Sequence, residues 1–349
     1  MTPSGPFCFC TKEIVVATKP IGIYHEHPDW FRPLFNELDR RGTHYERIDA
    51  GRHRFDPASD DDTRFALVFN RMSPSAYLRG RAHSILYTQH FLGHLEQLGV
   101  RVINGATAFR NETSKALQLS LLRSLGLPFP AARVINHPSE APAAAYGLRF
   151  PIVVKANIGG SGAGIVRFDA LEDLQRAVDE GRVNLGLDET ALVQEYVPAR
   201  GGHITRVEVL NSKYLYAINV YSTGESFNLC PADICQSKDG VELARAACAV
   251  DAPKNNLRVE GYQPPDEVIA EVELIMAAAQ IEIGGVEYMI DDRDGQRYYY
   301  DINALSNFVA DAPRVIGFDP FVRLADWLED EADSAERRRT TASEVATAV

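Results

Sequence analysis

Strand-like runs alternate with helix-like stretches over the first hundred residues. The runs EIVVA (13–17), HYERID (44–49), FALVFN (65–70) and VRVI (100–103) predict strands. Apolar positions at 30, 31, 34, 35 and 38 share one helix face, with Asp29 as the expected N-cap and Gly42 as the stop. A second helix is expected over 79–99. This alternation predicts βα units around a parallel sheet.

The rest of the chain divides into two further units and a tail. Residues 105–192 predict helices at 112–125 and 171–181 around the strands PIVVK (151–155) and GIVRF (164–168). Residues 193–330 are rich in strands, namely LVQEY (192–196), ITRVEVL (204–210), YLYAINV (214–220), GGVEYMI (284–290) and RYYYDIN (297–303). We therefore predict an α/β domain over 1–104, two further domains of which the last is α+β, and a flexible, polar tail over 331–349.

Composition narrows the class of partner. The chain has 36 Lys and Arg against 48 Asp and Glu, a net charge of −12, which disfavours nucleic acid and anionic membranes as partners. No apolar run approaches the ~18 residues of a membrane helix, and the N-terminus lacks a signal-peptide pattern, so a cytoplasmic location is expected. Five thinly spread cysteines predict reduced thiols, with zinc at Cys230 and Cys235 a less favoured alternative to a packed loop.

The stretch from Lys155 to Gly164 is rich in glycine and follows an apolar strand. Four glycines within six residues leave backbone N–H groups free to converge on an anion, and Lys155 lies at the end of the strand. A dinucleotide fingerprint or a P-loop opens onto a helix, whereas here a second strand follows and GK[ST] is missing. The pattern favours a hairpin that closes over phosphates; a merely flexible hairpin is the alternative.

Two carboxylates are expected to face each other in the hairpin 287–303. If 293–295 form a three-residue loop with Gly295 left-handed, Glu287 lies directly opposite Asp301, and Asn303 shares their face. Carboxylates about 5 Å apart at Cβ repel unless a cation or a proton lies between them. With the amide oxygen added, the set predicts a Mg²⁺ site, and an exposed polar strand face is the alternative.

These features occur in an order that resembles the ATP-grasp superfamily of carboxylate–amine ligases. The likeness is to the branch with ribosomal protein S6 glutamate ligase (RimK-like), glutathione synthetase and D-alanine–D-alanine ligase. It covers about 65–330 and rests on NETSKALQLSLLRSLGLPFP, GGSGAG after Lys155, LVQEYVP, GGHITRVEV, GGVEY and YYYDIN. The resemblance implies a three-domain ATP-grasp architecture with an N-terminal parallel-sheet domain. It also implies a reaction in which ATP activates a carboxylate as an acyl phosphate and an amine then displaces phosphate.

The resemblance also implies roles for individual residues. Those implied to bind ATP are Lys115, Lys155, Gly159, Gly160, Ser161, Gly162, Gln194, Glu195, Tyr196 and Val197, with His203 or Thr205 near the ribose. Arg206 would act with Lys155 in catalysis, facing the γ-phosphate and the acyl phosphate. Glu287, Asp301 and Asn303 would bind two Mg²⁺ ions, for which Mn²⁺ is an alternative.

Departures from the family pattern concern the substrate. The metal pair has Glu first and Asp second, and D-alanine ligases have an arginine where this chain has Gly285. The usual Pro-Gly after the asparagine is replaced by a loop containing Ser306 and Asn307, both candidate substrate contacts. Arg71 follows FALVFN at the sheet edge where ligands bind, and is a candidate carboxylate clamp or a helix-start salt bridge. The segment 223–240 is expected to be a substrate lid.

Three functions are compatible with these residues. The leading one is a ligase that joins a small-molecule carboxylate to an amino acid or peptide, with a homo-oligomer left open. A kinase-like enzyme acting on a hydroxyl is disfavoured because basic candidates for its acceptor pocket are few, namely Arg71, Arg79, Arg81 and Arg314. A nucleotide-binding module without turnover is disfavoured because neither a phosphate lysine nor a metal ligand is missing.

Overall fold

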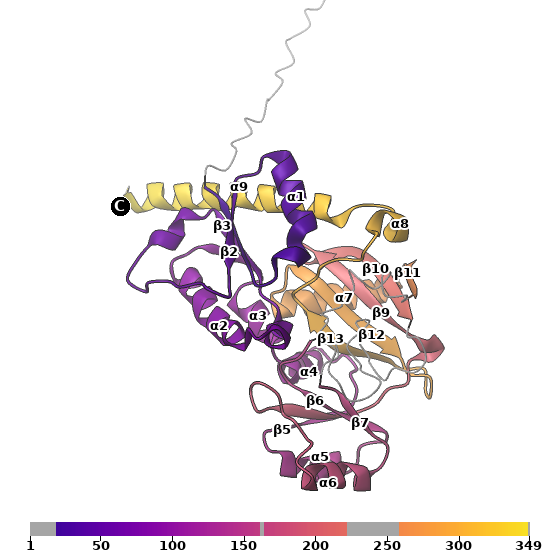
Figure 1. Ribbon diagram of the computed structural model, residues 1–349. Coiled ribbons are helices and arrows are strands. Elements are labelled where there is room, and N and C mark those ends of the chain that lie inside the picture. The colour runs from indigo at the N-terminus through magenta and orange to yellow at the C-terminus, as the bar shows by residue number, and fades with distance from the viewer. Residues whose placement is uncertain (1–18, 161–163, 222–257, 348–349) are drawn as a thin grey trace, which may run out of the picture.

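The computed structural model of the protein describes residues 19–160, 164–221 and 258–347. The strands of these residues form three sheets, two of four strands and one of five. Figure 1 shows the three sheets as successive parts of the molecule, with the five-stranded sheet between the other two. No helix in these ranges is both long and apolar enough to cross a lipid bilayer.

The N-terminal sheet is parallel throughout, as the alternating pattern predicts. Its strands β1 (Ile21–His25), β2 (Tyr45–Asp49), β3 (Leu67–Arg71) and β4 (Arg101–Ile103) lie in the order β2-β1-β3-β4. The accompanying helices are η1 (Pro28–Phe31), α1 (Arg32–Arg41), η2 (Asp61–Arg64), η3 (Pro74–Arg79) and α2 (Ala82–Gln97). Gly42 ends α1 with φ +73°, as expected, but Asp29 lies inside η1 and is not the cap of α1. The predicted strand 13–17 lies outside the described residues.

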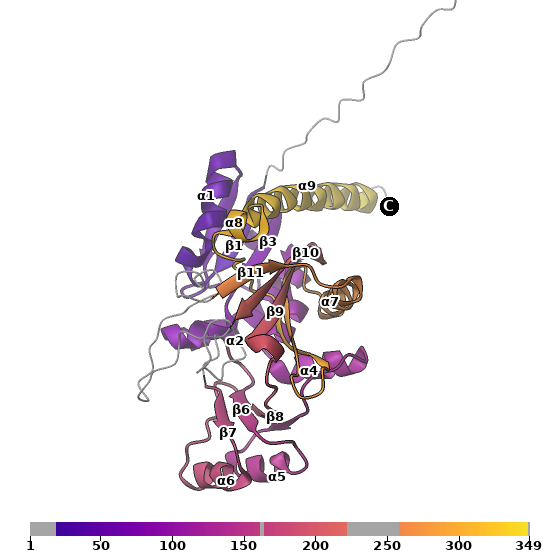
Figure 2. The same cartoon turned by 90° about the vertical axis from the view of Figure 1, so that its right-hand side faces the viewer.

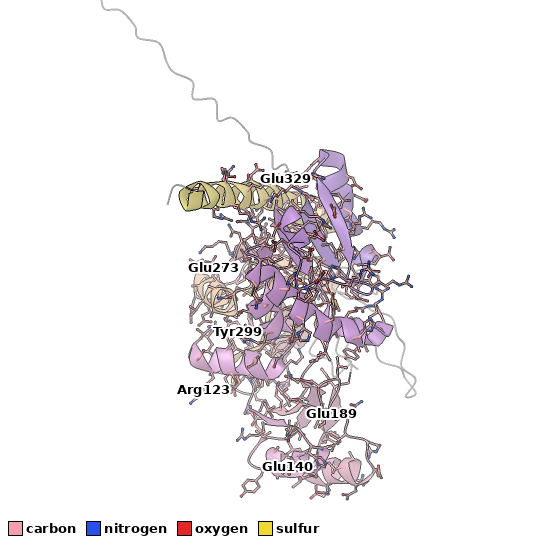
Figure 3. The ribbon with its side chains drawn as sticks, turned by 90° about the vertical axis from the view of Figure 1, so that its left-hand side faces the viewer. Arg123, Glu140, Glu189, Glu273, Tyr299 and Glu329 are labelled. Atoms are coloured by element: carbon pink, nitrogen blue, oxygen red, sulfur yellow. The ribbon has the colours of Figure 1, made fainter. Side chains whose placement is uncertain are left out.

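The central unit forms an antiparallel sheet at the far end of the molecule. Its elements are α3 (Ala106–Glu112), α4 (Lys115–Ser124), β5 (Ala132–Ile135), η4 (Pro138–Glu140), α5 (Ala141–Ala145), β6 (Ile152–Ala156), β7 (Val166–Phe168), α6 (Leu171–Asp179) and β8 (Ala191–Glu195). The strand order is β5-β8-β6-β7. Because β6 and β7 pair antiparallel across the glycine-rich stretch, the predicted strand–loop–strand arrangement is confirmed. Figure 3 shows Glu140 and Glu189 in this unit, far from Glu329.

The five-stranded sheet is antiparallel and carries different packing on its two faces. Its elements are η5 (Arg200–Gly202), β9 (His203–Leu210), β10 (Lys213–Tyr221), β11 (Arg258–Tyr262), α7 (Asp266–Ala279), β12 (Ile283–Ile290) and β13 (Arg297–Asn303), in the strand order β11-β10-β9-β12-β13. Val207 and Val209 pack with Val272 of α7 on one face. Tyr216 and Ile218 belong to a cluster with residues of α1 and of the C-terminal helix on the other.

The tail expected to be flexible is helical instead. After α8 (Ala312–Ile316), helix α9 runs from Pro320 to Thr347. Leu328 and Ala332 recur at helical spacing and are buried in one cluster with Leu38 of α1. This stripe was not recognised because beyond 331 it consists of alanines, whose short side chains give a weak periodic signal. Figures 1 and 2 show α9 lying along the N-terminal sheet, which joins the two ends of the described chain.

Candidate active site

Three strands of the five-stranded sheet bring the predicted charged residues into one cross-strand row. Arg206 of β9 pairs with Glu287 of β12, and Glu287 pairs with Asp301 of β13. The predicted opposition of the two carboxylates is therefore confirmed. We call the sheet face that carries this row the catalytic face.

The turn that was expected to produce this register is different. Asp291 and Gln296 are joined by a backbone hydrogen bond of 2.8 Å, so the loop has four residues and Ile290 pairs with Arg297. That register alone would place Glu287 opposite Tyr300. An irregularity between Glu287 and Tyr288 shifts the pairing by one residue and restores the contact with Asp301.

Glu287 is fully buried and Asp301 is partly buried, and protein cations neutralise both carboxylates. Arg206 Nη1 lies 2.9 Å from Glu287 Oε1, and the Tyr300 hydroxyl donates to Glu287 Oε2 at 2.7 Å. Burial, assisted by the charge of Asp301, raises the pKa of Glu287. Burial also disfavours the charged form of Asp301, but the Lys115 charge and hydrogen bond outweigh it and hold the pKa of Asp301 below its usual value.

Both predicted phosphate lysines converge on this row. Lys115 is the first residue of α4, and Asn157 fixes that helix end by accepting from the Ser114 hydroxyl at 3.1 Å and the Ala116 N–H at 2.9 Å. Lys155, on β6, is 4% exposed. Burial, and next the charge of Lys115, lowers the pKa of Lys155 to about 7. The two cations therefore repel each other at a place suited to a polyanion.

The described part of the glycine loop reaches the N-terminal domain. A Cβ built on Gly160 would lie 2.9 Å from the Cβ of Ser75 in η3, and one built on Gly159 would lie 3.9 Å from Lys115 Cε. Only a residue without a side chain fits this approach at position 160. Ser161 and Gly162 lie outside the described residues.

The expected adenine hinge contains a buried amide. Gln194 is fully buried, and neither its amide oxygen nor its nitrogen has a hydrogen-bond partner in the described ranges. The register of β6 and β8 pairs Gln194 with Val153, so Gln194 and Lys155 project from the same face. Buried amides are normally satisfied, so this side chain indicates a polar group still to be supplied.

Other predicted nucleotide contacts are engaged differently. Glu195 accepts the Arg149 backbone N–H at 2.8 Å, and Tyr196 donates its backbone N–H to Pro151 at 3.0 Å. Val197 is buried in the apolar cluster beside α9. His203 begins β9, with its ring centroid 5.0 Å from that of Tyr221.

The loop after β13, residues 304–308, is held by Arg71 of the N-terminal domain and by Glu112 of the central unit. Arg71 is 2% exposed and donates to the Ala304 and Ser306 carbonyls, while Glu112 Oε1 accepts the Leu305 N–H at 2.8 Å. Ser306 and Asn307 are buried in this loop. The guanidinium of Arg71 thus holds the backbone of the candidate substrate loop.

Sequence reasoning missed two buried carboxyl groups near this loop. Burial raises the pKa of Glu112 to about 8. Glu208 of β9 accepts from Arg206 Nε at 2.6 Å. The available signals were positional: Glu112 precedes Lys115 by three residues, and Glu208 follows Arg206 by two, which places it on the same strand face.

Few side chains of the predicted site could bind a metal ion. In the residues that the structure describes, no cluster of three or more His, Cys, Asp and Glu side chains is placed to hold a metal ion. Glu287, Asp301 and Asn303 therefore offer two carboxylates and one amide, and Asn303 Nδ2 lies 3.3 Å from Asp301 Oδ2. Cys230, Cys235 and the expected lid 223–240 lie outside the described residues.

Part of the chain is similar to known proteins. Residues 112–229 match the family model described as the RimK-like ATP-grasp domain. The D-alanine–D-alanine ligase of Haemophilus influenzae is 30% identical over 141 residues, covering 39% of this chain and 46% of that protein. The probable alpha-L-glutamate ligase of Alcanivorax borkumensis is 27% identical over 124 residues, covering 35% of this chain and 40% of its own. The chain thus spans less than half the length of these two relatives.

A solved structure extends the likeness to most of the chain. The ATP-grasp ligase PsnB, in complex with a phosphomimetic variant of its minimal precursor, Mg and ADP, superposes with a TM-score of 0.61 at 19% identity. The match covers 89% of this chain and 98% of that one. Residues 112–229 are therefore similar to the RimK-like ATP-grasp domain, and most of the chain shares the fold of the ATP-grasp ligase PsnB.

Proposed function

We propose that the protein is an ATP-dependent ligase that activates a carboxylate as an acyl phosphate and joins it to the amine of an amino acid or peptide. The observation that carries this proposal is the convergence of Lys115 and Lys155 on the row formed by Arg206, Glu287 and Asp301. Two lysines and an arginine beside one buried and one partly buried carboxylate suit a reaction that gathers phosphate charge and divalent cations.

The residues of the row fit Mg²⁺. Both carboxylates already contact cationic side chains, Arg206 and Lys115, so the site is built for positive charge. Their oxygen atoms, with the Asn303 amide oxygen, are the hard ligands that Mg²⁺ shares with substrate phosphates. When bound, Mg²⁺ would neutralise phosphate charge, and we propose two ions at Glu287, Asp301 and Asn303, with Mn²⁺ as a substitute.

The protein's own groups would then position ATP and the reacting carboxylate. Lys115 leaves Asp301 and, with Lys155, holds the phosphates, while the loop at Gly159 and Gly160 covers them. The Gln194 amide and the backbone of 195–197 hold the adenine. Arg206 faces the γ-phosphate and later the oxyanion that forms when the amine attacks.

The substrate side is formed by the loop after β13. We propose that Ser306 and Asn307 contact the substrates and that Arg71 acts by fixing their backbone. The kinase alternative lacks support, because Arg79 pairs with Glu26 at 2.7 Å, Arg81 with Asp49 at 3.1 Å and Arg314 with Asp311 at 2.5 Å. We place the enzyme in the cytoplasm and its partners among small molecules and peptides.

A substrate screen tests this function. The full chain is supplied with Mg²⁺, ATP and pairwise mixtures of amino acids, dipeptides and simple carboxylates, and ADP and phosphate release are followed. We expect release only when a carboxylate and an amine are both present, with a product whose mass equals the two substrates minus water. Phosphorylation of a hydroxyl compound without any amine would support the kinase, and binding of ATP without turnover in every mixture would support the nucleotide-binding module.

A further inference from the structure

A second row of paired residues crosses the sheet beside the charged row and ends next to the substrate loop 304–308. Glu208 of β9 is paired with Tyr216 of β10 and with Gly285 of β12, and Gly285 is paired with Asn303 of β13. Asn303 directly precedes the loop 304–308, and the Tyr216 hydroxyl accepts the N–H of Val309, just after this loop, at 3.0 Å. Glu208 therefore lies between Arg206 and the end of the site assigned to substrates.

The carboxylate of Glu208 is only half satisfied. The residue is 2% exposed, and its Oε1 accepts from Arg206 Nε at 2.6 Å. Its Oε2 is buried and has no hydrogen-bond partner in the ranges that the structure describes. A buried carboxylate oxygen is an acceptor that calls for a donor, and a cationic donor suits it best.

The residue opposite Glu208 leaves room for this carboxylate. A Cβ built on Gly285 would lie 3.0 Å from Arg206 Nε and 3.1 Å from both Cδ and Oε1 of Glu208. A side chain at position 285 would thus press on the ion pair. Glu208 and Gly285 together place a negative charge beside the arginine that we assign to the acyl phosphate.

We propose that Glu208 receives the protonated amine of the acceptor substrate and takes its proton. This inference rests on the ligase function proposed above. One N–H proton of the ammonium group passes to Glu208 Oε2, and the freed lone pair forms the C–N bond with the acyl carbon. The C–O bond to phosphate then breaks with its electron pair leaving on phosphate, which takes the second N–H proton. Because Arg206 contacts Glu208, nucleophile and electrophile are brought to adjacent positions.

The acceptor class follows from this geometry. A group that gives up a proton to a buried carboxylate and is drawn to it by charge is an amine that is cationic at neutral pH. The α-amine of an amino acid or peptide, or an alkyl amine, meets this description. A hydroxyl or thiol acceptor gains nothing from the negative charge before reaction.

The test separates acyl phosphate formation from amine attack. Full-length Glu208→Gln is compared with the wild type at pH 7, using a carboxylate and an amine that pass the substrate screen. Hydroxylamine, which is uncharged at this pH, traps the acyl phosphate as a hydroxamate without needing a base. We expect hydroxamate formation within about threefold of wild type and amide formation lower by about 10²-fold or more. Raising the pH until the amine is neutral in solution should recover part of the amide formation.

Two further variants control this result. Glu208→Asp keeps a carboxylate and should retain more amide formation than Glu208→Gln. Glu273→Gln, on α7 against the other face of the sheet (Figure 3), should change neither reaction. Loss of both reactions in Glu208→Gln would mean that Glu208 only positions Arg206 or supports the fold, and unchanged amide formation would mean that it has no role; either outcome overturns the inference. If the wild type itself forms neither hydroxamate nor amide, the ligase proposal fails, and this inference fails with it.

Discussion

At the scale of single residues, the catalytic face is a set of buried charges that compensate one another. Lys115 pairs with Asp301, and Arg206 lies between Glu287 and Glu208. A buried ion without a partner is strongly unfavourable, so ligands that enter here exchange partners with these side chains. The Lys115–Asp301 pair must open for the lysine to hold phosphate and for the carboxylate to hold a metal ion.

Asp301 is the residue for which this exchange matters most. We expect Asp301→Asn to lower turnover by about 10²-fold or more, because the variant loses one of two anionic metal ligands and leaves Lys115 without its counter-charge. Steady-state ADP release measures the effect. Asp292→Asn, at the exposed tip of the same hairpin, is the matched control and should keep wild-type activity. Near-normal turnover in Asp301→Asn would remove the metal assignment.

The lowered pKa of Lys155 predicts that the protein takes up a proton when it binds a nucleotide. Its pKa of about 7 in the free protein lies well below the usual lysine value, because burial and the Lys115 charge disfavour the cation. Phosphate oxygens favour the cation and raise this pKa. At pH 8 the free side chain is mostly neutral, so binding should take up close to one proton; at pH 6 it is already charged and uptake should vanish.

Calorimetry measures this proton directly. Mg·ADP or a non-hydrolysable ATP analogue is titrated into the protein at pH 8 in buffers of different ionisation enthalpy. Lys155→Arg stays charged at all these pH values, so it should bind with little uptake. Equal uptake by the variant and the wild type would assign the proton to another group.

At the scale of elements, the sequence could predict that Glu287 faces Asp301 in the hairpin. It could not predict the length of the loop or the shift in register between the two strands. The pairing of Glu287 with Asp301 follows from alternation, and Gly295 is left-handed as expected. The four-residue loop and the irregularity near Tyr300 have opposite effects on register and cancel at Glu287. A bulge has no sequence signature of its own here, because it depends on how Tyr300 packs and on its hydrogen bond to Glu287.

The backbones of β12 and β13 approach each other closely at Gly284, so a substitution at this position tests the geometry of the hairpin. A Cβ at position 284 would lie 2.1 Å from the Asn303 carbonyl oxygen, which belongs to the backbone and cannot turn away. We expect Gly284→Ala to lower the free energy of unfolding by about 2 kcal/mol or more and to displace Asn303. Urea unfolding measures the stability, and ADP release measures the site.

A glycine in open surroundings provides the matched substitution. A Cβ on Gly93, within α2, meets nothing within 4 Å and its φ is not positive. Gly93→Ala should therefore stabilise the protein by about 0.5–1 kcal/mol. If both substitutions changed stability equally, the close approach at Gly284 would not be the cause.

At the scale of the whole molecule, helix α9 packs on the N-terminal domain. The parallel order of the N-terminal sheet follows from local patterns, but the docking of α9 does not, because its partners are hundreds of residues away. Arg41 of α1 contacts Asp326 and Glu329 of α9. Long-range pairs of this kind leave no trace in local periodicity, which explains why the segment after 330 was predicted as a flexible tail.

Arg339 shows how strongly the end of α9 is tied to the N-terminal domain. Its guanidinium donates to the carbonyls of Phe65 at 2.8 Å and Gly99 at 3.1 Å, which lie just before β3 and just after α2. We expect Arg339→Met to lower the free energy of unfolding by about 1–3 kcal/mol, because these carbonyls lose a charged donor while the aliphatic packing is kept. Arg337→Met, whose side chain bonds only within α9 in the contacts given by the structure, should stay within about 0.5 kcal/mol of wild type. Urea unfolding compares the two. Since the N-terminal domain also holds the substrate loop through Arg71, Arg339→Met should raise the KM for the carboxylate or amine more than the KM for ATP. An equal rise in all three would argue that α9 supports the whole fold rather than this domain.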